Sequence, residues 1–231
     1  MRELGKVCVS IGAAHAEAAA EAVSAVARFV DLVEIRLDAM REPNVADCLQ
    51  KISLPLLFTN RPVWEGGGFS GREEDRLVPL MAAARQGAAY VDLELRTEAD
   101  LRRQLRRVCA DTGCGLILSW HDFSSTPAEA ELFDLVERMA EAGADLGKVV
   151  TTAQGPDDVI RVLSLLQMAA RIGFKLSAFC MGEAGRISRF ATIHLGGAMT
   201  YVAPDEQSAT APGQFSAQHF AQLNRLFFHA D

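Results

Sequence analysis

The chain has 231 residues, of which 49% are hydrophobic, and a formal net charge of −7, so it is long enough to bury a sizeable core. The acidic balance argues against a nucleic-acid partner, because contact with phosphates requires a basic surface, and no apolar run is long enough to cross a membrane. Its five cysteines form no Cys-x-x-Cys pair and no cluster with histidine, which argues against zinc and, with the lack of a signal-peptide apolar region, predicts a cytoplasmic protein.

Short β-branched runs alternate with helical patterns along the whole chain. The predicted strands are 6–11, 32–37, 55–60, 90–95, 115–120, 148–152, 174–179 and 199–203. The predicted helices are roughly 15–29, 44–51, 72–87, 98–111, 127–142, 156–171, 183–191 and 215–229. Eight strand–helix units without a linker predict an α/β fold, a (β/α)8 TIM barrel in a single domain over residues 1–231. A doubly wound open sheet is the alternative.

Local signals mark several helix ends. Thr126 and Pro127 predict an N-cap and a first residue for helix 127–142, and Gly155 and Pro156 do the same for helix 156–171. Helices are expected to stop at the glycines at positions 87, 113, 143 and 173.

Charged side chains occupy alternate positions on two predicted strands. Glu34 and Arg36 share one face, as do Asp92 and Glu94, because successive strand side chains point to opposite sides. Buried charges are costly unless they line a site, so a barrel with a polar mouth fits them better than an open sheet. Glu34 and Arg36 either contact a substrate or form a buried ion pair with each other. Asp92 and Glu94 are expected to be structural.

Residues 59–71 follow the third strand and contain Arg61, Glu65 and a glycine-rich stretch. Residues 66–71 match the pattern G-x-G-x-x-G, but they do not follow the strand directly, and Glu65 would place a carboxylate beside a pyrophosphate. A dinucleotide site is therefore rejected. We expect the glycines to form a mobile loop while Arg61 and Glu65 project into a site. An ordinary turn with surface charges is the alternative.

His121 follows the fifth strand directly, at the C-terminal strand end where barrel enzymes hold catalytic groups. The ordinary pKa of a histidine lies near neutrality, which suits general acid and base work. A loop histidine with local hydrogen bonds is the alternative. The other histidines, at positions 15, 194, 219 and 229, are expected to be structural or surface residues.

Lys148 is the most informative single residue, because lysine occurs only at positions 6, 51, 148 and 175. β-Branched residues follow it in a predicted strand, so its ammonium is expected to be half-buried. Loss of hydration favours the neutral, nucleophilic amine that a Schiff base requires. Lys148 begins its predicted strand, whereas barrel catalysis takes place at the other strand end. Either its side chain extends along the interior or the strand begins earlier.

Two later stretches offer groups for an anion. Arg189 follows a glycine-rich turn at 181–189 and is a candidate anion clamp. Thr210 and Gln214 flank Ala-Pro-Gly in a polar loop after the last strand, and their hydroxyl and amide suit hydrogen bonds to a carboxylate. Either stretch taken alone could be an ordinary loop.

Taken in order, these stretches resemble the type I 3-dehydroquinate dehydratases, the Schiff-base class of the shikimate pathway. The matching residues are 34–38 (Glu-Ile-Arg-Leu-Asp), 59–62 and 65–67 (Thr-Asn-Arg-Pro and Glu-Gly-Gly), 119–123 (Ser-Trp-His-Asp-Phe), 148–153 (Lys-Val-Val-Thr-Thr-Ala), 181–182 and 188–189 (Met-Gly and Ser-Arg), and 211–214 (Ala-Pro-Gly-Gln). They span nearly the whole chain.

The resemblance implies a (β/α)8 barrel that dehydrates 3-dehydroquinate to 3-dehydroshikimate, without a metal or organic cofactor and commonly as a homodimer. It implies that Lys148 forms the Schiff base and that His121, beside Glu65, transfers protons as base and acid. The implied substrate contacts are Glu34, Arg36 and Arg61 for the ring hydroxyls, and Arg189 and Gln214 for the carboxylate, with Thr210 where serine is common in the family. We expect the loop 201–210 to be longer than is usual in the family, and the N-terminal hairpin of some relatives to be absent.

Two other functions fit parts of the pattern. A class I aldolase would use the same lysine on the same barrel, but it usually binds phosphate and needs no acid for dehydration. A catalytically silent barrel would bind ligand without a covalent adduct.

Overall fold

The computed structural model describes residues 4–228. The strands are β1 (Lys6–Ile11), β2 (Leu32–Arg36), β3 (Leu56–Thr59), β4 (Tyr90–Glu94), β5 (Gly115–His121), β6 (Leu146–Thr152), β7 (Leu176–Met181) and β8 (Met199–Val202). The α-helices are α1 (Ala16–Val26), α2 (Val45–Lys51), α3 (Glu73–Arg85), α4 (Ala99–Thr112), α5 (Glu129–Glu141), α6 (Pro156–Arg171), α7 (Arg186–His194) and α8 (Ala217–Phe228). Short 3₁₀ helices are η1 (Ala27–Phe29), η2 (Leu37–Ala39) and η3 (Val63–Glu65).

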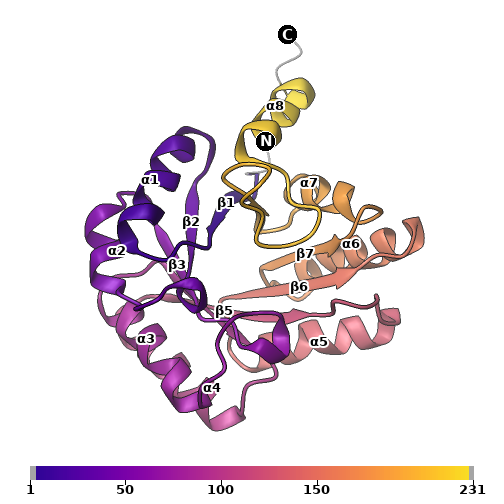
Figure 1. Ribbon diagram of the computed structural model, residues 1–231. Coiled ribbons are helices and arrows are strands. Elements are labelled where there is room, and N and C mark those ends of the chain that lie inside the picture. Colours follow the sequence, from indigo (N-terminus) through magenta and orange to yellow (C-terminus); the bar gives the residue numbers. More distant parts are fainter. Residues whose placement is uncertain (1–3, 229–231) are drawn as a thin grey trace.

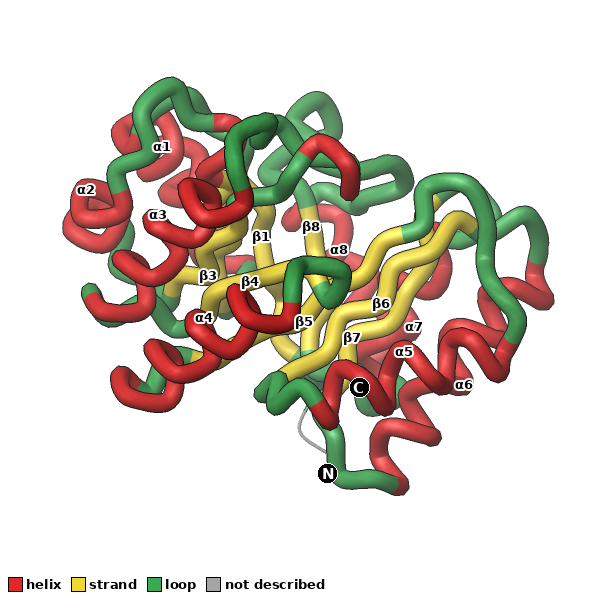
Figure 2. The backbone as a smooth tube through the Cα atoms, turned by 90° about the horizontal axis from the view of Figure 1, so that it is seen from below, coloured by secondary structure: helices red, strands yellow, loops and turns green. Residues whose placement is uncertain are grey.

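The strands form a parallel barrel that confirms the predicted TIM-barrel fold. Each strand from β1 to β6 pairs with the next along the chain, and β8 pairs with β1. Ala198 N donates to Leu176 O at 2.8 Å and Met199 N to Ser177 Oγ at 3.1 Å, which joins the edges of β7 and β8. Figure 1 shows the helices around the outside of the strands, and Figure 2 shows the same arrangement from below. This sequential order excludes the doubly wound sheet, in which the strand order reverses.

Several predicted boundaries shift. β6 begins at Leu146, two residues before its predicted start, so Lys148 lies inside the strand. The predicted cap at Thr126 is wrong, because α5 begins at Glu129 and the Thr126 hydroxyl instead contacts Thr151 Oγ1 and Thr152 O. α7 spans 186–194 rather than 183–191, and residue 229 of the last predicted helix lies outside the described residues. The four glycines expected to end helices all have positive φ, a region that glycine enters without strain.

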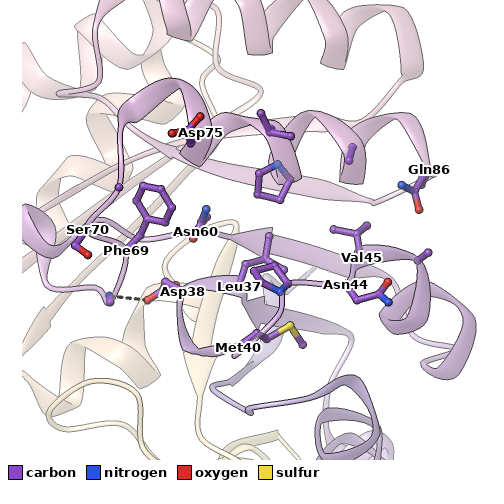
Figure 3. Close-up of a pocket in the computed structure, with 17 residues that line it drawn as sticks. Leu37, Asp38, Met40, Asn44, Val45, Asn60, Phe69, Ser70, Asp75 and Gln86 are labelled. Atoms are coloured by element: carbon purple, nitrogen blue, oxygen red, sulfur yellow. Dashed lines mark hydrogen bonds between the residues drawn. The ribbon is translucent and has the colours of Figure 1, made fainter.

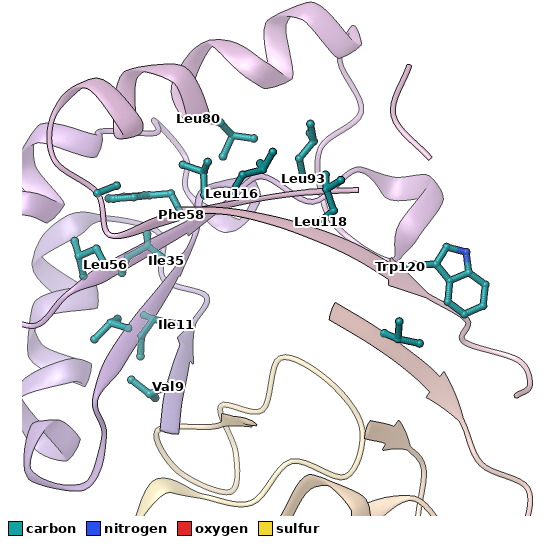
Figure 4. Packing of buried hydrophobic residues seen from close by; sticks show 14 of the residues in the cluster. Val9, Ile11, Ile35, Leu56, Phe58, Leu80, Leu93, Leu116, Leu118 and Trp120 are labelled. Atoms are coloured by element: carbon teal, nitrogen blue, oxygen red, sulfur yellow. The ribbon is translucent and has the colours of Figure 1, made fainter. Parts of the chain in front are cut away.

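The core has two parts, one outside and one inside the barrel. Outward strand side chains such as Phe58, Leu93 and Leu116 pack against the helices, including Leu80 of α3 (Figure 4). The inside begins with an apolar layer that includes Cys8, Leu32, Leu57, Ile117 and Leu146. Two positions further along the same strands come Ser10, Glu34, Thr59, Ser119 and Lys148, all buried. A charged layer therefore lies above an apolar one, on the side of the strand C-terminal ends.

Candidate active site

Lys148 lies in the barrel interior between two carboxylates. It is 5% exposed, and its Nζ is 3.4 Å from Asp92 Oδ2 and 3.6 Å from Glu34 Oε1. The Nζ also lies 3.9 Å from the centroid of the Tyr201 ring, close enough for a cation–π contact. Both carboxylates therefore lie within ion-pairing distance of the Nζ. The side chain extends along the interior from the middle of β6, which resolves the question of its place in the strand.

Glu34 and Arg36 do not form the ion pair that was one alternative. The Glu34 carboxylate accepts hydrogen bonds from the hydroxyls of Ser10 and, at 2.8 Å, Thr59. Burial alone would raise the pKa of Glu34, but Lys148, Arg36 and the Ser10 hydroxyl together lower it to about 2.

Arg36 instead pairs with Asp38, at 2.6 Å. Asp38 also accepts from the backbone N of Arg61 and of Gly68, each at 3.0 Å. The contact with Gly68 is the dashed line in Figure 3. Asp38 therefore fastens the glycine-rich loop to the end of β2, beside an outer cavity of about 740 Å³ that lies between the α2 and α3 regions.

Arg61 joins Asp92 and Glu94 in a buried ionic network. Its guanidinium lies 2.9 Å from Asp92 Oδ1 and 2.5 Å from Glu94 Oε1, and it donates to Ser119 Oγ at 2.7 Å. Glu94 Oε2 in turn lies 2.5 Å from Nη1 of Arg76, which is fully buried on α3. Asp92 and Glu94 thus have the structural partners that were expected of them, and Asp92 also contacts the lysine.

His121 and Glu65 form a hydrogen-bonded pair, with 2.9 Å between Nδ1 and Oε1. Burial raises the pKa of Glu65 to about 8, against the opposing effect of Arg61. Burial lowers the pKa of His121 well below its usual range, and Arg61 and Lys148 lower it further, so the near-neutral value of an ordinary histidine does not hold here. An acid and a base in this arrangement share one proton, and they titrate as a pair.

The local chain explains how Glu65 reaches His121. Glu65 is the last residue of η3, which ends at Gly66 with φ 78°. A Cβ on the next residue, Gly67, would lie 2.1 Å from the carbonyl oxygen of Arg61. Only glycine allows this turn, so the glycine-rich stretch bends the chain back and holds the carboxylate inward.

Arg189 is a buried cation whose charge no carboxylate balances within residues 4–228. It is 1% exposed, its Nη2 donates to Pro212 O at 3.0 Å, and its Nε has no hydrogen-bond partner. Burial lowers its pKa to about 10. Gln214 Oε1 accepts from Thr210 N at 2.9 Å, which closes the loop next to this cation. A buried guanidinium without a carboxylate partner has the charge and the hydrogen-bond donors to bind a carboxylate.

One cavity brings together every site residue predicted from the sequence. It is lined by Glu34, Arg36, Arg61, Glu65, His121, Lys148, Arg189, Thr210 and Gln214, together with residues that the sequence did not single out, such as Phe123, Phe179 and Tyr201. The inward alternation of β8 would have identified Tyr201, which follows Met199 by two positions. No pattern in the sequence could have identified the fully buried Arg76, because its partner lies on another element.

Two broader observations concern residues 4–228. None of the helices in this part of the chain is both long and apolar enough to span a bilayer. Nor does it contain three or more His, Cys, Asp or Glu side chains arranged to hold a metal ion. His194 and His219 have polar partners, Asn224 Oδ1 at 3.1 Å and Glu206 Oε1 at 3.0 Å, while His229 lies outside the described range.

Comparison with known sequences gives a consistent family. A sequence model described as type I 3-dehydroquinase matches residues 7–231. The 3-dehydroquinate dehydratase of Desulfotalea psychrophila is 46% identical over 211 residues, covering 91% of this chain and 93% of the relative. That of Haloquadratum walsbyi is 35% identical over 216 residues, covering 89% and 88%.

Solved structures agree with the sequence comparison. A crystal structure of type I 3-dehydroquinate dehydratase from Clostridium difficile, with covalent modified comenic acid, superposes with a TM-score of 0.89 at 25% identity. The superposition covers 100% of this chain and 94% of that one.

Proposed function

Because the chain belongs to the type I 3-dehydroquinase family and is a 3-dehydroquinate dehydratase, a hydro-lyase, we propose that it converts 3-dehydroquinate to 3-dehydroshikimate through a Schiff base on Lys148, with His121 as general base and acid. The observation that carries this proposal is that three kinds of group face one cavity: a buried lysine, a carboxylate–histidine pair and a guanidinium without a carboxylate partner. In one small substrate, the lysine would react with a ketone, the carboxylate–histidine pair would move a proton, and the guanidinium would bind a carboxylate.

In the first step, Lys148 gives a proton to His121 and attacks the ketone carbon as the neutral amine. The hydroxyl of the carbinolamine takes that proton back and leaves as water, which gives an iminium. The iminium retains a positive charge where the ammonium stood, between Asp92 and Glu34. These carboxylates therefore stabilise the iminium relative to the neutral carbinolamine. The Clostridium difficile enzyme holds covalent modified comenic acid, which supports covalent chemistry in this family.

His121 then takes a proton from the carbon next to the iminium, giving an enamine. The same histidine returns the proton to the leaving hydroxyl, which departs as water and leaves a conjugated iminium. A second water hydrolyses that iminium and releases 3-dehydroshikimate and Lys148. The water formed with the first iminium and the water used here cancel, so the net loss is one water. Glu65 orients His121 through Nδ1.

The remaining residues bind the substrate. Arg189 meets the substrate carboxylate, and Thr210 and Gln214 add a hydroxyl and an amide beside it. Glu34, Arg36 and Arg61 are proposed to meet the ring hydroxyls; all three line the cavity. This set fixes the ring so that one face presents its proton to His121.

We further propose that the whole chain acts as one catalytic domain in the cytoplasm, as a homodimer without a metal or organic cofactor. Light scattering after gel filtration measures the oligomeric state. Activity after exhaustive dialysis against a chelator tests the independence from metal.

The decisive experiment is borohydride reduction in the presence of 3-dehydroquinate, followed by peptide mass mapping. We expect a reduced adduct on Lys148, none in Lys148→Ala, and an undiminished adduct in the control Lys175→Ala, whose lysine is exposed. An adduct on another lysine would still indicate an enzyme that works through an imine, but it would show that Lys148 is not the residue that forms it. Ligand binding without any adduct would favour the silent barrel, and carbon–carbon cleavage would favour the aldolase.

A further inference from the structure

The carboxylate of Glu65 has one oxygen that its partnership with His121 leaves unsatisfied. Oε1 faces the imidazole, whereas Oε2 is buried and has no hydrogen-bond partner. A buried carboxylate oxygen in this state is costly unless a charge lies close to it. The guanidinium of Arg96 lies 4.0 Å from Oε2.

Arg96 approaches this oxygen from outside the substrate cavity. It follows β4 by two residues, is 48% exposed, and does not line the cavity. Its guanidinium Cζ lies 5.3 Å from the centroid of the Trp120 ring, and Trp120 is the residue before His121 on β5. The stacked ring holds the cation in place without neutralising it.

The other charges around the pair belong to the interior. The charged groups that act on Glu65 and His121 besides Arg96 are Arg61, Asp92 and Glu94 for the carboxyl, and Arg36, Arg61, Lys148 and Arg189 for the imidazole. Those groups either bind one another or face the substrate. Arg96 is the cation that acts on the Glu65–His121 pair without belonging to the interior ionic network and without lining the substrate cavity.

The protonation of the pair decides what His121 can do. With Glu65 ionised and Nδ1 carrying the only proton, Nε2 of the imidazole is free to act as a base. With one more proton on the pair, Nε2 is protonated and acts as an acid. A positive charge at Oε2 favours the first state, because that state carries one more negative charge.

We propose that Arg96 is a positioning residue that stabilises ionised Glu65 through Oε2 and so sets the pH at which His121 becomes a base. This inference rests on the proposed function. It predicts that loss of the Arg96 charge moves the acid limb of the pH profile of kcat/KM to higher pH. The rate at pH values above the limb should stay unchanged.

The test compares wild type, Arg96→Gln and Arg96→Lys across the pH range, with Arg103→Gln as the control. Arg103 lies on α4, is 63% exposed, and pairs with Asp100. Because Arg96 is half exposed, we expect Arg96→Gln to shift the acid limb upward by about half a pH unit. At pH values below the limb this is about a threefold loss of kcat/KM. Arg96→Lys keeps the positive charge and should show little of this shift, and Arg103→Gln should show none.

A uniform loss of rate at every pH, with an unmoved limb, would show that Arg96 only supports the loop and would overturn the proposal. An unchanged profile would do the same. Titration of the His121 ring followed by NMR gives a second measurement that needs no turnover: the apparent pKa of the pair should rise in Arg96→Gln. If wild type fails to convert 3-dehydroquinate, the proposed function is wrong, and the titration still decides the electrostatic role of Arg96.

Discussion

Arg76→Met breaks an ion pair in which both partners are fully buried, and we expect it to destabilise the fold by about 3 kcal/mol. Arg76 Nη1 lies 2.5 Å from Glu94 Oε2, and the same side chain donates to Asn60 O at 3.1 Å and to Thr97 Oγ1 at 2.8 Å. Removing one partner of a buried pair typically costs about 3–5 kcal/mol, because the other charge stays in a place without water. The expected value lies at the lower end because Arg61 still contacts Glu94.

Urea unfolding at neutral pH, analysed by linear extrapolation, measures this free energy. Glu94→Gln and the double variant Arg76→Met/Glu94→Gln complete a cycle. We expect the double variant to lose about 1–3 kcal/mol less than the sum of the single losses, since the second substitution removes the buried charge from which the first one takes a partner. Arg103→Met, at an exposed pair, should stay within about 0.5 kcal/mol of wild type. A loss below about 1 kcal/mol for Arg76→Met, or strict additivity, would refute this reasoning.

Three further outcomes follow from the site. Burial raises the pKa of Glu65 from 4.5 to about 8, so the folded state favours the uncharged carboxyl. The contribution of this group to the free energy of unfolding is therefore complete below pH 4.5 and is lost as the pH rises through 8. Glu65→Gln should therefore gain stability relative to wild type by at most about 5 kcal/mol between pH 5 and pH 9 in urea unfolding, and parallel pH curves would contradict this. Gly67→Ala should cost about 1–3 kcal/mol and lower turnover, because its Cβ would meet Arg61 O at 2.1 Å. The control Gly155→Ala, whose Cβ would have no atom within 4 Å, should leave stability and turnover nearly unchanged. Arg189→Gln should raise KM by about ten- to a hundredfold through the lost charged hydrogen bonds, and a wild-type KM would exclude this residue as the carboxylate site.

The sequence predicted the barrel because each strand–helix unit carries its own local signals. β-Branched runs, helix-stopping glycines and Pro156 depend on neighbours along the chain, and the structure has all of them in their expected roles. Failures came where a side chain found a distant partner instead. Thr126 was expected to cap a helix, yet its hydroxyl contacts the end of β6.

The sequence by itself also determined which side chains share a face of one strand, since alternation with a period of two places Glu34 and Arg36 on the same side of theirs. Only the tertiary structure decided which of these groups meet. Arg36 pairs with Asp38 rather than Glu34, and Lys148 lies against Asp92 from a strand 56 positions away. Local periodicity defines a direction for each side chain, whereas strand register and barrel closure set the distances between elements. Charge pairing depends on those distances.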